Sequence, residues 1–154
     1  MAKITIIRLL LSVYIPFQLL IMFWVYTMFN SFTYSPGYEM MKRIIIVHGI
    51  SAIILLPALI SLWLSFHYFL KHGYFNTKSR RFLKISGYIL AVNTIITLIL
   101  DLALCYIPGY SKWEQFPGEL SSLVPVLLIG IGLLVVVDFM KQGESIEQEN
   151  AELI

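Results

Sequence analysis

The feature that most limits the fold of this chain is a set of long apolar segments that contain almost no charge. There are four of them, at about residues 9–29, 44–70, 85–107 and 120–140. A helix needs about 20 apolar residues to cross roughly 30 Å of hydrocarbon, and each segment is near or above that length. Membrane strands would alternate polar and apolar residues, whereas residues 53–56 are all Ile or Leu. The sequence therefore predicts an all-α integral membrane protein with four transmembrane helices.

The composition agrees with solvation by lipid. Of the 154 residues, 58% are hydrophobic and 13% are charged, whereas soluble domains are about 25% charged. A soluble domain of this length could not enclose so much apolar surface. A formal net charge of +2 without a dense basic tract argues against direct nucleic-acid binding. We expect one membrane domain over residues 1–154, with a short acidic tail at 141–154.

Short connections and basic residues predict the topology. Because the connections are short, consecutive helices should be antiparallel neighbours in an up-down-up-down bundle. The first apolar segment is too long for a signal peptide, so we keep it as a span. Placing both termini in the cytoplasm puts eight basic residues inside, namely Lys3, Arg8, Lys71, Lys78, Arg80, Arg81, Lys84 and Lys141. It leaves three outside, namely Lys42, Arg43 and Lys112. This bias favours cytoplasmic termini.

Two segments carry a resemblance to a family. Residues 74–88 read YFNTKSRRFLKISGY, and residues 143–150 read GESIEQEN. The chain resembles the small bacterial four-helix membrane proteins grouped as domain of unknown function 2975, although the closing residues after Asn150 depart from that pattern. The resemblance implies a protein of the bacterial inner membrane, often encoded beside a small helix-turn-helix regulator. It supplies no catalytic residue.

Ionisable side chains inside the spans are the first candidates for function, because charge at membrane depth is costly. His48 lies four residues, or about 6 Å, inside the outer end of the second span, and Asp101 lies six residues, or about 9 Å, inside that of the third. A hydrogen-bonded pair would make a site that responds to external pH. The alternatives are a purely structural pair, or an Asp101 that is wetted by the interface and does not contact His48.

Asn93 is the third polar candidate within the spans. Pro57 in the second span frees the backbone carbonyl of Ile53, four residues earlier, and a neighbouring group should satisfy it. Asn93 reaches that carbonyl only if a kink shifts the helix, and it could instead bond its own helix or a water molecule. A polar path past His48, Asn93 and Asp101 would indicate a transporter.

Small residues predict where the helices pack closely. Membrane helices approach best at Gly, Ala and Ser, because no hydrophobic effect drives their association in lipid. The candidates are Gly87 and Ala91 on the third span, Ala58, Ser61 and Ser65 on the second, and Gly130 and Gly132 on the fourth. Contacts within the bundle are favoured over dimerisation, and the oligomeric state stays open.

Two charged segments fall on the predicted cytoplasmic side. The residues of interest are Lys78, Arg80, Arg81 and Lys84 in the second connection, and Glu147 and Glu149 in the tail. The basic loop could contact anionic lipid while the tail is solvated. The two segments could also pair with each other, or together bind a soluble protein partner such as a small helix-turn-helix regulator.

No combination of residues points to catalysis, a cofactor or a metal. The chain has no Ser-His-Asp set, Walker loop or HExxH motif, and its single Cys105 cannot form a cysteine cluster. His48 and His67 are about 28 Å apart along one helix and cannot share a haem iron. The sequence favours a non-enzymatic bacterial inner-membrane protein that acts as an interaction or regulatory partner. The alternative is a small transporter or channel subunit.

Overall fold

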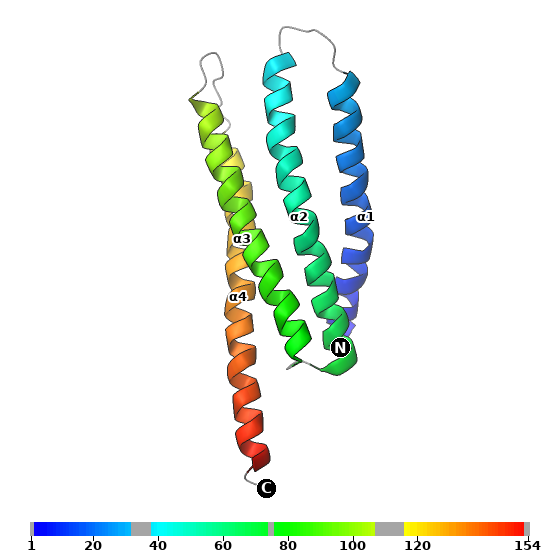
Figure 1. The fold of residues 1–154 in the computed structure, drawn as a ribbon, viewed down its shortest axis with the longest axis vertical. Coiled ribbons are helices and arrows are strands. Elements are labelled where there is room, and N and C mark those ends of the chain that lie inside the picture. Colours follow the sequence, from blue (N-terminus) through cyan, green and yellow to red (C-terminus); the bar gives the residue numbers. More distant parts are fainter. Residues whose placement is uncertain (1, 32–37, 74–75, 107–115, 153–154) are drawn as a thin grey trace.

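The chain folds into four long helices. The computed structural model describes residues 2–31, 38–73, 76–106 and 116–152. The helices are α1 (Ala2–Ser31), α2 (Tyr38–His72), α3 (Thr77–Cys105) and α4 (Phe116–Glu152) (Figure 1). Each contains an apolar stretch of 26 to 29 residues, long enough to cross a membrane. The prediction of an all-α protein with four such helices is confirmed. Helices α1, α2 and α4 extend past both ends of the segments that hydropathy marked, whereas α3 begins earlier, at Thr77, and ends at Cys105, before the predicted end at residue 107.

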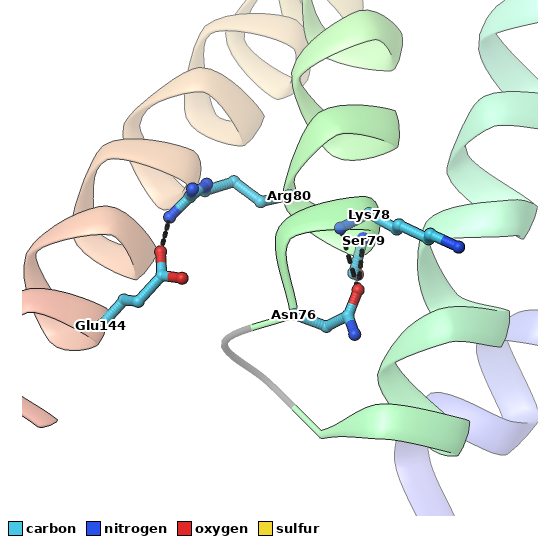
Figure 2. Close-up of polar contacts among 5 residues, drawn as sticks. All are labelled: Asn76, Lys78, Ser79, Arg80 and Glu144. Carbon is cyan, nitrogen blue, oxygen red and sulfur yellow. Dashed lines mark hydrogen bonds and ion pairs between the residues drawn. The ribbon is translucent and has the colours of Figure 1, made fainter. Parts of the chain in front are cut away.

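The turn between α2 and α3 is fixed by local backbone chemistry. Gly73 ends α2 with a φ of +84°, a conformation that favours glycine, and its N–H donates to the carbonyl of Phe69 at 3.0 Å. Asn76 caps α3, because its Oδ1 accepts from the backbone N–H of Lys78 at 2.8 Å and of Ser79 at 3.4 Å (Figure 2). This short turn places the end of α2 beside the start of α3.

The helices contact one another in chain order. Helix α1 packs on α2, α2 on α3, and α3 on α4. The contacts join the end of one helix to the start of the next, as Ser65 and Ser79 do, so neighbouring helices lie antiparallel (Figure 1). Within the described residues α1 does not contact α4, and the four helices form an open row.

The open row follows from the side chains of α1. Between Lys3 and Asn30 there is no glycine or alanine, and the one serine, Ser12, bonds Trp63 of α2, so α1 offers no run of small residues for close backbone approach to α4. Its large apolar side chains instead point outward: Leu10, Val13 and Leu20 are each 65 to 72% exposed. A water-soluble monomer rarely leaves so continuous an apolar face uncovered, whereas lipid chains cover it at no cost.

Helices α3 and α4 make a close backbone contact at two glycines. A Cβ placed on Gly87 would lie 2.9 Å from the carbonyl oxygen of Gly130 and 3.0 Å from a Leu134 methyl group. A Cβ on Gly130 would in turn lie 2.9 Å from the backbone nitrogen of Ala91. Of the small residues singled out in these two helices, Gly87, Ala91 and Gly130 form this contact. Gly132 is exposed, and nothing lies within 4 Å of where its Cβ would be.

Candidate functional site

Small residues, all of them polar except one alanine, line the interface between α2 and α3. They recur every seven residues on both helices, and they pair Ser65 with Ser79, Ala58 with Ser86, and Ser51 with Asn93. Because seven residues are close to two helical turns, the three layers lie about 10 Å apart along one face of each helix. We call these six residues and Thr97 the polar seam. It runs along the buried side of α3.

The first two layers join side chains to backbone carbonyls across the interface. Ser65 Oγ lies 3.0 Å from the carbonyl oxygen of Ser79, and Ser79 Oγ lies 2.9 Å from that of Ser65. In the next layer Ser86 Oγ donates to the carbonyl oxygen of Ala58 at 3.0 Å. All four residues are fully buried. Contacts of this kind require the two backbones to be close, so small side chains and hydrogen bonds act together here.

The third layer contains an unsatisfied acceptor. Asn93 Nδ2 donates to Ser51 Oγ at 3.0 Å. Thr97 Oγ1 lies 3.1 Å from Ser51 Oγ and 2.9 Å from the carbonyl oxygen of Asn93. A hydroxyl carries one proton, so Thr97 donates to one of these two oxygens at a time. Asn93 Oδ1 is buried without a hydrogen-bond partner among the described residues. Burying such an acceptor costs about 1–3 kcal/mol.

The seam was only partly visible in the sequence. Asn93, Ala58 and Ser65 stood out individually, whereas Ser51, Ser79, Ser86 and Thr97 did not. The shared seven-residue spacing on both helices is the signal that would have found the whole set. The sequence left open whether Asn93 bonds the Ile53 carbonyl, its own helix or a water molecule, and in the structure its amide donates to the Ser51 hydroxyl of α2. Ser61, also a candidate, is partly buried and takes no part in the seam's hydrogen bonds.

Ser51→Ala should lower the free energy of unfolding by about 1–2 kcal/mol, because it leaves the buried Asn93 amide with no partner. Adding Asn93→Ala should recover part of that loss, since the unpaired amide is then gone. Unfolding of the wild type, both single variants and the double variant in mixed micelles measures this coupling. Strictly additive losses would contradict the hydrogen bond.

His48 and Asp101 are not brought together. Asp101 is 1% exposed on α3, whereas the His48 side chain is exposed. His48 lines a mainly apolar groove of about 450 Å³ between α1 and α2, together with the buried Gln18. No hydrogen bond or ion pair joins His48 to Asp101 among the described contacts. The predicted pH-responsive pair is therefore not formed in this structure.

The charged ends of α3 and α4 are linked by an ion pair. The Arg80 guanidinium contacts the Glu144 carboxylate, and Figure 2 shows it reaching from α3 to α4. Among the predicted basic candidates, only Arg80 has a described acidic partner. Lys78, Arg81 and Lys84 are exposed, with the Nζ of Lys78 lying 5.8 Å from the Tyr68 ring centroid.

The acidic tail continues α4, which ends at Glu152. Glu149 is exposed, and the side chain of Glu147 falls outside the described residues. The acidic residue that binds the basic segment is thus Glu144, at the start of the tail and not among the two candidates. The prediction that loop and tail approach each other holds for this one pair.

The described residues bring together no group of three His, Cys, Asp or Glu side chains that could hold a metal ion. His67 stacks on Trp63 with ring centroids 5.7 Å apart, and its Nδ1 is buried without a partner in the described part of the chain. No family model, curated protein or solved structure matches the sequence. The resemblance drawn from residues 74–88 and 143–150 therefore stays a prediction.

Proposed function

We propose that this chain is a non-enzymatic protein of the bacterial inner membrane that binds a soluble partner at its cytoplasmic face. Its helices would cross the bilayer in an up-down-up-down order, with both termini and the α2–α3 turn in the cytoplasm. The excess of Lys and Arg at this end supports that orientation. A small helix-turn-helix regulator is the kind of partner that the family resemblance suggests.

The observation that carries the proposal is the arrangement of charge where α3 begins and α4 ends. Helix α4 has 37 residues, about 55 Å at 1.5 Å per residue, so it exceeds a 30 Å hydrocarbon layer. In Figure 1 its C-terminal end projects past the α2–α3 turn. The Arg80–Glu144 ion pair braces this projection against α3. Three charged side chains remain exposed on the two helices, namely Lys78, Arg81 and Glu149. A soluble partner could therefore contact both positive and negative side chains there.

Photo-crosslinking from this surface tests the proposal. A crosslinking residue at Arg81 and another at Glu149, each in the full chain in native membranes, should capture the same protein partner, because both positions belong to one surface. Ile95, which is 49% exposed in the middle of α3, provides the matched control and should capture lipid only. Lipid adducts alone at all three positions would contradict the proposal.

A small transporter or channel subunit is the second candidate. The unsatisfied Asn93 Oδ1 in the middle of α3 favours it, since an unpaired buried amide oxygen can coordinate a passing cation. The other polar groups of the seam bond to each other in separate layers, which favours a closed interface instead. Ion or proton flux into vesicles that contain the purified chain, lost in Asn93→Ala, would select this candidate over the first.

A further inference from the structure

A half-buried arginine lies at one end of the interface between α1 and α2. The Arg8 guanidinium carbon is 5.5 Å from the centroid of the Trp63 ring, within the range of a cation–π contact. The indole is held in place by Ser12, whose hydroxyl accepts from Trp63 Nε1 at 2.8 Å and donates to the carbonyl oxygen of Arg8 at 2.9 Å. His67 stacks on the same indole, with an interplanar angle of 11°. Arg8 therefore lies on a preorganised aromatic surface.

This arginine has no acidic neighbour. Helix α1 contains no Asp or Glu, and α2 contains none after Glu39, near its opposite end. The other carboxylates of the four helices lie on α3 and α4, and neither of these helices contacts α1 in the described structure. Among the described residues, Arg80 and Glu144 form the only ion pair. An anion that pairs with Arg8 would therefore come from outside the described helices.

The position of Arg8 indicates where that anion comes from. Arg8 lies about 13 Å from the middle of α1, and Trp63 lies about 12 Å from the middle of α2. Half the thickness of a typical hydrocarbon core is about 15 Å, so a long arginine side chain at the position of Arg8 can reach the headgroup region. Lys3 and Lys71 are exposed further out on the same two helices.

We propose that Arg8, supported by Trp63 and Ser12, binds the phosphate group of an anionic phospholipid. A guanidinium presents paired N–H donors that match two phosphate oxygens, and it is weakly enough hydrated to give up part of its water shell at the membrane surface. The outward apolar side chains of α1 then lie where the acyl chains of the same lipid run. The site is distinct from the surface at the ends of α3 and α4.

Native mass spectrometry of the purified full chain in detergent, titrated with lipid, tests the assignment. The wild type should bind one phosphatidylglycerol about tenfold more tightly than phosphatidylcholine. The phosphate charge of phosphatidylcholine is neutralised by the quaternary ammonium of the same headgroup, whereas phosphatidylglycerol keeps a net negative charge that attracts Arg8. Arg8→Gln should abolish this preference, and Arg8→Lys should keep only part of it. The control Lys3→Gln removes an exposed cation from the same helix and should leave the preference within about twofold. Each variant is shown to be folded if its helix content and its thermal melt match those of the wild type.

Three results would overturn the proposal. One is equal binding of the two lipids by the wild type. Another is an equal loss of preference in Lys3→Gln and Arg8→Gln, because the effect would then reflect net charge alone. The third is displacement of phosphatidylglycerol by inorganic phosphate at matched concentration, since the site would then bind free phosphate rather than a lipid headgroup. Retained preference in a folded Arg8→Gln variant would equally exclude Arg8 as the ligand.

Discussion

Gly87→Leu should give the largest loss of stability of any single substitution proposed for this chain, about 3 kcal/mol in the free energy of unfolding. The first atom of the new side chain would already lie 2.9 Å from the carbonyl oxygen of Gly130, and backbone cannot move aside as a flexible side chain can. Relief requires α3 and α4 to separate along the contact. Unfolding of the purified protein in mixed micelles measures the loss.

Gly132→Leu is the matched control, because it adds the same side chain to α4 two residues from Gly130. Nothing lies within 4 Å of the added Cβ there, and the residue is exposed, so its unfolding free energy should stay within about 0.5 kcal/mol of wild type. If Gly87→Leu unfolded like Gly132→Leu, the close contact between α3 and α4 would not exist in the membrane protein.

Ser86→Leu should give the second largest effect, about 2–3 kcal/mol, by wedging α2 away from α3. Ser86 is fully buried and faces Ala58, which is also fully buried, so the interface has no room for three more carbon atoms. Ser86→Ala removes only the hydrogen bond to the Ala58 carbonyl, and in membranes such bonds average about 0.6 kcal/mol. The ratio of the two losses tells whether packing or hydrogen bonding dominates the seam.

Tyr88→Leu provides the control for this pair of substitutions. Tyr88 is 52% exposed two residues along α3, and leucine there should melt close to wild type. A loss from Ser86→Ala that equals the loss from Ser86→Leu would show that the hydrogen bond, and not close packing, holds the two helices together.

The helices themselves could be predicted because the relevant information is local. A long run without charge specifies a membrane helix wherever it occurs, and the short connections make sequence neighbours contact each other. Gly87 and Gly130 were also recognisable, since small residues in lipid have few uses other than close packing. The open row was not predictable from span order. It depends on α1 having no small-residue face to bring toward α4.

The pairing of polar residues could not be predicted, because depth along a helix does not fix the direction of a side chain. His48 and Asp101 were placed at similar depth, but successive residues differ by about 100° around a helix. Val47 takes the position that faces α3, where it packs with Leu104, and His48 is therefore turned toward α1. To predict the polar seam, one must know the register between α2 and α3. That register becomes clear only when Ser51, Ala58 and Ser65 are aligned with the equally spaced residues Asn93, Ser86 and Ser79.

Arg80 and Glu144 illustrate the same limit at the ends of the helices. The sequence indicated that a basic segment and an acidic tail share one side of the membrane. It did not indicate which carboxylate would meet which cation, because that depends on how far α4 extends past the start of α3. Glu144 is the residue that comes level with Arg80, and Glu149 lies more than a turn beyond it.

The central claim is that the α2–α3 turn and the end of α4 lie together on the cytoplasmic side of a membrane that all four helices cross. Single cysteines at Thr77, Ser145 and Ser111, each in a Cys105→Ser background, test it with an impermeant thiol reagent added to intact cells. Only the cysteine at Ser111, in the connection between α3 and α4, should react before the cells are opened, and those at Thr77 and Ser145 should react afterwards. If the cysteine at position 77 or 145 reacted in intact cells, the orientation would be contradicted. If all three cysteines reacted equally, the membrane-spanning arrangement itself would be contradicted.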